Sequence, residues 1–255
     1  MKNEVKVHEV NPSNFKNRRD FLKISGLAVA GTGLLLAGCN DDDDNGTPNN
    51  QQLPGIRNGV FDLGGGDLGI LTYAYALEQL EADFYTKVVN ATGFAATFNS
   101  TEQEVLTDLY KHELIHREFF KAAITGVLVE AGQDPAARLL PNLTFDYGTL
   151  NFSDRNSVLA TSKALEDTGV AAYNGAGRYI VNPEYLLLAG KIVSVEARHA
   201  SAIRSLINPN SMDFAGDDVV TTDTGLDVAR KPSVIIGEVK SLNIIQNEFT
   251  AQFLS

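Results

Sequence analysis

The segments ALEQLEADFY (76–85) and ALEDTGVAAY (164–173) carry one pattern twice: alanine, leucine and glutamate, then a tyrosine seven residues after the glutamate. Each segment is followed by a Glu-x-x-His motif, at 113–116 after the first and at 196–199 after the second. The chain therefore presents glutamate, tyrosine and Glu-x-x-His in the same order twice. A lone Glu-x-x-His recurs by chance, whereas this matched repeat indicates a shared structural role.

The repeated acids lie on helical faces that are otherwise apolar. Residues at three- and four-residue steps around Glu78 form an apolar stripe, which the glutamate interrupts. Glu196 interrupts a similar stripe in the later segment. Because residues i and i+3 are neighbours on a helix, His116 projects beside Glu113, and His199 projects beside Glu196. The pattern predicts carboxylates and imidazoles that point into the core.

Buried carboxylates need a partner, because an isolated one costs several kcal/mol out of a total stability of about 5–15 kcal/mol. Few Lys and Arg residues lie on these faces. Two divalent cations would offset four carboxylates, and two neutral imidazoles would complete the ligand set. Oxygen and nitrogen ligands without thiolate suit iron or manganese, and zinc is the less favoured choice. We expect two metal ions at six ligands: Glu78, Glu113, His116, Glu166, Glu196 and His199.

Periodicity, caps and helix breakers predict five helices. Asp67 is the expected cap of the first helix, and Ser100 with Gln103 is the expected capping box of the second. Asn182 and Pro183 begin the fourth. The short run Val234-Ile235-Ile236 could instead start a strand. The predicted ranges are about 67–91, 101–131, 154–175, 183–208 and 233–253.

The lengths of the connections predict how these helices are joined. The first and second helices are separated by about ten residues, and the third and fourth by fewer. A stretch of more than 20 residues, from Gly132 to Ser153, lies between the second and third. Short, long and short connections are typical of two hairpins joined by one crossover. The expected fold is all-α: a four-helix bundle of two hairpins, with an additional C-terminal helix.

With all six ligand positions filled, the chain resembles the ferritin-like superfamily, whose di-iron and di-manganese sites use this ligand order. The segments 76–85 and LEDTGVAAYNGAG (165–177) are more closely similar to bacterial ferritin-like domain proteins related to plant desiccation-related proteins. The resemblance covers about residues 66–208 and implies a ferritin-like bundle. It also implies that Tyr85 hydrogen-bonds Glu166, and Tyr173 hydrogen-bonds Glu78, although plain core tyrosines would fit these positions equally well.

Two further ionisable residues lie close to the expected ligands in the sequence. Glu81 is three residues after Glu78 and could replace it as the ligand. The repeat favours Glu78, because Gly169 occupies the position that matches Glu81 in the second copy. His112 lies four residues before His116, and we expect it at the surface or beside a ligand rather than on the metal.

The segment HELIH (112–116) also matches the H-E-x-x-H motif of zinc metallopeptidases. A catalytic zinc site needs a third protein ligand, and the Gly and third His of the metzincin continuation do not follow His116. The later His199 lies in its own Glu-x-x-His motif, with Val195 before it. A peptidase would also leave the twofold repeat unexplained, so this reading is the less favoured one.

The N-terminus has the layout of an export signal. Arg18-Arg19 and the following apolar stretch resemble a twin-arginine signal, and Leu36-Ala37-Gly38-Cys39 resembles a lipobox with Cys39 as the lipidated residue. We therefore expect a signal peptide at 1–38 and export to a lipid anchor in the bacterial cell envelope, with the outer membrane or cell surface as a possible destination. An acidic, flexible tether is expected at 39–65, because its composition buries little apolar surface.

Composition narrows the classes of function. The 255 residues include 44% hydrophobic residues and one cysteine, which excludes a disulfide framework and a Cys-based metal site. Residues 1–38 hold six basic and three acidic residues, so the chain from Cys39 onward carries a formal charge of −14. This charge argues against nucleic acid as a partner. The acidic loop expected at 209–232 has no assigned role, and the sequence predicts no oligomeric state.

Two functions fit the expected site. In the first, a dinuclear centre reacts with O₂ or peroxide, oxidising Fe²⁺ or removing reactive oxygen species. Either Glu113 and Glu196 or the opposing glutamate pair would bridge the metals. In the second, the bundle is a non-catalytic envelope stress or desiccation protein whose metal is structural. A cage-forming iron store is a third class, but a lipid anchor on every subunit would conflict with assembly of the cage.

Overall fold

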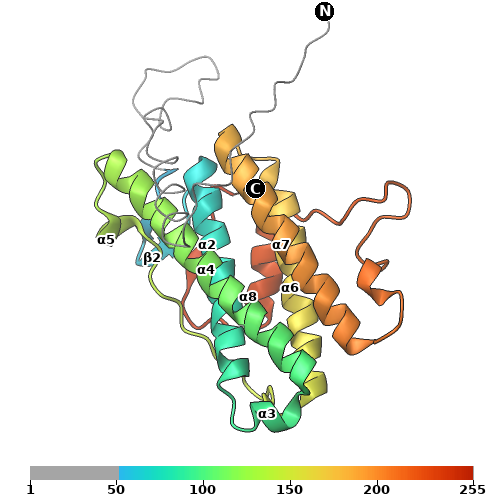
Figure 1. Ribbon diagram of the computed structural model, residues 1–255. Helices are drawn as coiled ribbons and strands as arrows, with labels where there is room; N and C mark the ends of the chain where they lie inside the picture. The colour runs from blue at the N-terminus through green and yellow to red at the C-terminus, as the bar shows by residue number, and fades with distance from the viewer. Residues whose placement is uncertain (1–51, 255) are drawn as a thin grey trace, which may run out of the picture.

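The computed structural model describes residues 52–254, and four long antiparallel helices form its body (Figure 1). The helix pairs α2/α4 and α6/α7 pack most extensively and form the two expected hairpins. This arrangement confirms the all-α bundle. The four helices are α2 (Gly66–Val89), α4 (Ser100–Glu130), α6 (Arg155–Gly177) and α7 (Pro183–Ile207), with the short α3 (Phe94–Thr97) inside the first hairpin.

Helix starts follow the capping rules, but two of them use other residues than expected. The capping box of α4 is formed by Asn99 and Glu102, not by Ser100 and Gln103, because the Asn99 side chain accepts from the Glu102 amide at 3.1 Å. The expectation for Asp67 was also wrong. The residue before α2 is Gly65, which has no side chain to cap with, and Asp67 instead accepts from the backbone amides of 181 and 182.

The other two long helices begin as predicted. The Asp154 side chain accepts from the Ser157 amide at 2.6 Å and caps α6. Asn182 caps α7 in the same way through the Glu184 amide at 2.9 Å, and Pro183 follows it. Since α7 starts beside Asp67, the carboxylate of α2 also fixes the start of α7 and holds the two hairpins together at this end.

The C-terminal segment departs from the expected helix at 233–253. Helix α8 (Pro232–Ser241) is only ten residues long, and Asn243 adopts a left-handed conformation with φ of 54°. The backbone at 244–246 then pairs with 144–146 of the crossover. Strand β3 (Phe249–Thr250) follows. The hydrophobic residues of 244–253 therefore pack in extended backbone instead of continuing the helix, whereas 234–236 is helical.

The expected tether also ends earlier than predicted. Strands β1 (Gly55–Arg57) and β2 (Val60–Asp62) pair as an antiparallel hairpin, and β3 joins β2 in parallel. Leu53, Phe61 and Leu63 are buried, and the Asp62 carboxylate accepts from Thr250 and from the Gln252 amide. Residues 52–65 are thus part of the fold. The expected signal peptide, Cys39 and the rest of the tether lie outside the described residues.

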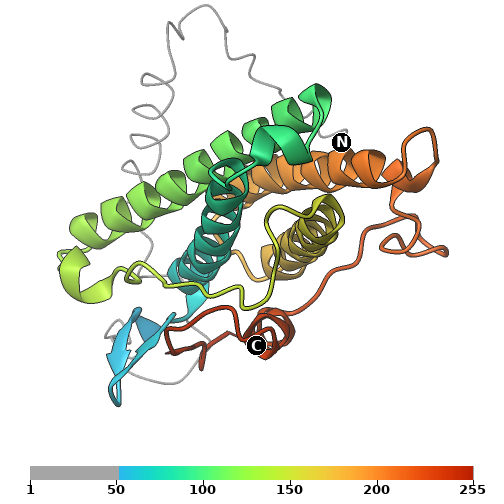
Figure 2. The same ribbon diagram turned by 90° about the horizontal axis from the view of Figure 1, so that it is seen from below.

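The crossover between the hairpins lies against α2 and meets the C-terminal segment there (Figure 2). It contains the short α5 (Pro135–Arg138) and then runs extended. Gln79 of α2 accepts from the Leu143 amide at 2.8 Å, and Tyr147 donates to the Leu80 carbonyl at 3.3 Å. Helix α8 packs on α6. These contacts place the crossover and α8 over one side of the bundle.

The loop after α7 is fastened to the bundle through a buried arginine. It contains a short 3-10 helix, η3 (Asp213–Ala215). Arg204 of α7 pairs with Asp167 of α6 at 2.7 Å and with Asp218 of the loop.

Among residues 52–254, no helix is long and apolar enough to cross a bilayer.

Candidate metal centre

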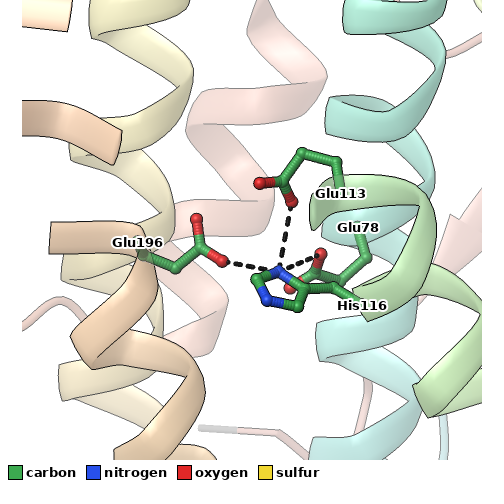
Figure 3. A group of neighbouring side chains, drawn as sticks. All are labelled: Glu78, Glu113, His116 and Glu196. Carbon is green, nitrogen blue, oxygen red and sulfur yellow. Dashed lines mark ion pairs between the residues drawn. The ribbon is translucent and has the colours of Figure 1, made fainter. Parts of the chain in front are cut away.

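Six side chains from the four long helices meet in the middle of the bundle. They form two groups of four residues. Within each group, every residue offers one ligand atom, and these atoms lie within 4.8 Å of one another. The glutamates 113 and 196 belong to both groups. The first group is Glu78, Glu113, His116 and Glu196 (Figure 3); the second is Glu113, Glu166, Glu196 and His199. The repeat in the sequence is therefore also a repeat in space. Each group has its own Glu and His, and the two glutamates that both groups share lie between them.

The first group is arranged around the Nδ1 atom of His116. This nitrogen lies 2.9 Å from Glu196 Oε1, 3.3 Å from Glu113 Oε2 and 3.4 Å from Glu78 Oε2. The three glutamates come from three different helices, and each is fully buried. One nitrogen and three carboxylate oxygens thus lie within 4.8 Å of one another.

The second group repeats this arrangement around His199. Its Nδ1 lies 2.8 Å from Glu113 Oε1, 3.4 Å from Glu166 Oε2 and 3.6 Å from Glu196 Oε2. Each of the two shared glutamates turns one oxygen toward His116 and the other toward His199. Each of these two carboxylates could therefore contribute one oxygen to each group, which favours Glu113 and Glu196 over Glu78 and Glu166 as the pair that two metal ions would share.

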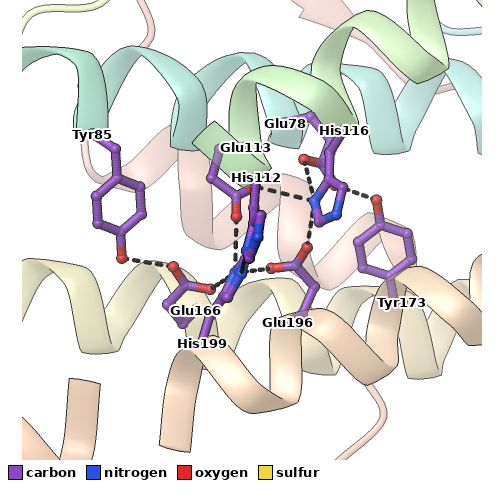
Figure 4. Close-up of polar contacts among 9 residues, drawn as sticks. All are labelled: Glu78, Tyr85, His112, Glu113, His116, Glu166, Tyr173, Glu196 and His199. Carbon is purple, nitrogen blue, oxygen red and sulfur yellow. Dashed lines mark hydrogen bonds and ion pairs between the residues drawn. The ribbon is translucent and has the colours of Figure 1, made fainter. Parts of the chain in front are cut away.

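Two tyrosines close the cluster at its opposite ends (Figure 4). Tyr85 Oη donates to Glu166 Oε1 at 2.6 Å, and Tyr173 Oη donates to Glu78 Oε1. Burial and the neighbouring carboxylates raise the pKa of both phenols, which therefore remain protonated donors. Each unshared glutamate has one oxygen held by a tyrosine from the other hairpin, and its second oxygen is left for the centre of the cluster.

His112 lies beside the cluster but belongs to neither group. Its Nδ1 is 2.9 Å from Nε2 of His199, and the two rings stack with centroids 5.2 Å apart. If His199 bound a metal through Nδ1, its Nε2 would carry the proton and would donate to His112 Nδ1. This contact orients the His199 ring. Because His112 belongs to neither group, the two histidines of HELIH are not brought together at one candidate metal site.

The ionisable groups of the cluster are buried close together, and this shifts their pKa values. Burial and the nearby Glu196 raise the pKa of Glu113 to about 8. Burial opposes protonation of His199, but Glu166 and the other carboxylates outweigh it and raise the pKa of this imidazole to about 12. The carboxylates raise the pKa of His116 in the same way, against the effect of burial. Without metal, protons on the two histidines balance part of the negative charge.

The donor set fits a pair of divalent metal ions. Eight inward-facing atoms of these six residues lie at ion-pair distance from one another but make no well-aligned hydrogen bond within residues 52–254: both carboxylate oxygens of 113 and 196, Oε2 of 78 and 166, and Nδ1 of 116 and 199. Buried polar atoms without partners are costly. Their common direction, their nitrogen and oxygen chemistry and the count of four carboxylates match two divalent cations.

Glu81 is the acidic residue whose surroundings the sequence did not predict. It belongs to neither group, in keeping with the assignment of Glu78 as the ligand. Yet it is 3% exposed, and burial followed by the charge of Glu196 raises its pKa well above the usual range. A Cβ atom on Gly169 would lie 3.0 Å from Glu81 Oε1. Gly169, which matches Glu81 in the second copy of the repeat, therefore leaves space for the Glu81 side chain.

Comparison with protein families agrees with this geometry. The family model of the ferritin-like domain matches residues 66–209, which is more than half of the chain. The chain therefore belongs to the ferritin-like domain family. No curated protein matches the chain.

Proposed function

We propose that the protein holds two iron or manganese ions in the bundle and uses them in chemistry with O₂ or peroxide. The observation that carries this proposal is the pair of buried ligand groups that share Glu113 and Glu196. Bound there, the metals would supply the electron transfer that oxidises Fe²⁺ or consumes reactive oxygen species. The residues would supply the geometry, the net charge and the exclusion of water.

Each residue type has a separate task in this proposal. Glu113 and Glu196 would each contact both ions, and His116 and His199 would each bind one. Glu78 and Glu166 complete the two sites, and the tyrosine hydrogen bonds keep one oxygen of each in a fixed position. Near-complete burial of the cluster excludes bulk water. His116 and His199 would bind as neutral imidazoles, so metal binding would compete with their Nδ1 protons.

The test is to purify the chain without residues 1–38 and measure its metal content by mass spectrometry and its Fe²⁺-dependent O₂ uptake. Two metals per chain with rapid uptake supports the proposal. Two metals without turnover favours the second candidate, a structural metal in an envelope stress or desiccation-type protein, which the deep burial of all six ligands also suits. One zinc with peptide cleavage would instead support a metallopeptidase.

We also propose that the protein is exported by the twin-arginine route and anchored to the envelope through lipidated Cys39. The support is the sequence of Arg18-Arg19, the apolar stretch and the lipobox, in the order that such signals require. A Cys39→Ser variant should be found in the soluble fraction of lysed cells, and a Ser255→Ala control should remain with the membranes. Recovery of both proteins in the membrane fraction would contradict the anchor.

A further inference from the structure

A cavity of about 710 Å³ lies between α2, α6, α8 and the crossover. Ligand pockets are typically roughly 300–1,000 Å³ and mostly apolar, with a few polar groups that fix orientation. The cavity has this character, since hydroxyl groups of Thr and Ser side chains interrupt a mainly hydrocarbon wall. Its apolar lining includes Leu77, Leu80, Leu150, Leu165, Val239 and Ile244. A single metal ion would leave most of this volume unfilled.

Glu81 is the buried ionisable group in the cavity wall. Its Oε2 atom has no hydrogen-bond partner within residues 52–254. Gly169 lies next to it, and a Cβ there would also lie 3.7 Å from Glu196 Oε2. The cavity therefore reaches inward to a carboxylate that lies close to a bridging ligand of the candidate metal centre. The other carboxylate of the wall, Glu238, is largely exposed and is paired with Arg230 at 2.9 Å.

Charge balance identifies the kind of group that Glu81 would accept. Two divalent cations would offset the four glutamates of the metal centre and leave Glu81 as a fifth buried carboxylate. Within the described part of the chain, no Lys, Arg or His forms an ion pair with it. Burial raises the pKa of Glu81, so without a partner this acid stays protonated, and a cationic donor would stabilise its ionised form. The complementary ligand has a cationic donor for Glu81 and a hydrocarbon body for the leucine-rich wall.

We propose that this cavity binds a primary amine with a hydrocarbon body, whose ammonium group donates to Glu81 beside the metal centre. The inference rests on the dinuclear site of the proposed function, because the metals neutralise the other four carboxylates. It extends that function by naming the class of small organic molecule that would be held next to the metals.

The test is isothermal titration calorimetry of n-hexylamine into the purified chain with its own metal, with n-hexanol and hexanoate as comparisons. The amine should bind, and hexanoate should not. Glu81→Gln keeps the side-chain shape but removes the charge, so it should weaken amine binding by about tenfold or more and leave hexanol binding unchanged. No binding of hexylamine, equal binding of hexanoate, or an unaffected Glu81→Gln variant would overturn the proposal.

A second pair of variants tests the cavity itself. Ala164 lines the cavity at an exposed position of α6, so Ala164→Phe should fill it and abolish binding of both hexylamine and hexanol. Ala122→Phe, at an exposed position of α4 away from the cavity, should bind both ligands as the wild type does. Equal binding by the two Phe variants would contradict the assigned cavity.

Metal content measured on the same samples separates this inference from the proposed function. A chain with two metals that does not bind hexylamine would sink the inference and leave the dinuclear site standing. A chain without metal would contradict the proposed function, and the Glu81→Gln titration would still decide whether the amine binds at Glu81.

Discussion

The two hairpins of the bundle agree at the positions that face the cluster and differ in the residues beside it. Both carry an unshared glutamate, a tyrosine, a shared glutamate and a histidine, and the structure places each tyrosine on the glutamate of the other hairpin. They differ where Glu81 matches Gly169 and where His112 matches Val195. The matching positions bring together a set of side chains that could hold two metal ions, whereas the differing positions give the first hairpin an additional acid and imidazole.

The largest expected effect separates shared from unshared ligands. Glu113→Ala or Glu196→Ala should remove both metals, because each of these glutamates has one oxygen near His116 and the other near His199. Glu78→Ala or Glu166→Ala should lower metal content less, toward one ion per chain, while Glu81→Ala should retain two. Metal analysis by mass spectrometry distinguishes these cases. Loss of metal in Glu81→Ala with retention in Glu166→Ala would reverse the ligand assignment.

A second expected effect concerns the pH dependence of the metal-free protein. The pKa of Glu113 is raised from near 4.5 to about 8, and that of His199 from near 6.5 to about 12. The folded chain therefore holds protons that the unfolded chain releases, so stability falls as pH rises. The contribution of Glu113 is fully present below about pH 4.5 and lost by about pH 8, and that of His199 begins to fall above about pH 6.5.

Thermal unfolding followed by circular dichroism tests this dependence. The opposite shift of Glu196, whose pKa is lowered to about 2 by the two histidines against the effect of burial, affects stability only in strong acid. The melting temperature of the metal-free protein should thus fall between about pH 5 and pH 8. The metal-loaded protein should show a much smaller slope, since metal displaces these protons. Equal slopes would show that metal and protons do not compete at the cluster.

Smaller effects are expected from the two tyrosines. Tyr85→Phe and Tyr173→Phe each remove one hydrogen bond to an unshared glutamate, and the loss of such a partner typically lowers metal affinity by about 10–100-fold. The two variants should be alike, because the hydrogen bonds are related by the repeat. Competition titrations with a chelator measure the change. A large difference between the two would break the symmetry of the hairpins.

The smallest expected effect belongs to His112, which has no counterpart in the second hairpin. His112→Ala removes the 2.9 Å contact that orients His199, so it should weaken metal affinity by about tenfold or less. Chain stability should change little, because His112 is exposed. Complete loss of metal in this variant would make His112 a ligand and would restore the HELIH motif as a zinc site.

The helices and ligand residues could be predicted from the sequence because both leave local signals. Caps, breakers and connection lengths predicted the two hairpins, and the repeat identified the six residues that the structure brings together. The cap of α4 was displaced because Asn99 and Ser100 are both good caps, and Asn99 alone can pair with Glu102. The strands contain only two or three residues, too few to show alternation.

The surroundings of Glu81 could not be predicted from the sequence for a different reason. Its burial depends on the space beside Gly169 and on how α8 and the crossover cover α2 and α6. These contacts join residues far apart in the chain, and the end of α8 near Asn243 decides where the following segment lies. No periodicity within α2 carries this information.

Anomalous diffraction from crystals of the metal-loaded protein tests the central claim most directly. Data recorded at the absorption edge of the bound metal should show two peaks inside the bundle, one beside His116 Nδ1 and one beside His199 Nδ1. Glu113 and Glu196 should each contact both ions. A single peak, or peaks outside the six side chains, would contradict the dinuclear centre.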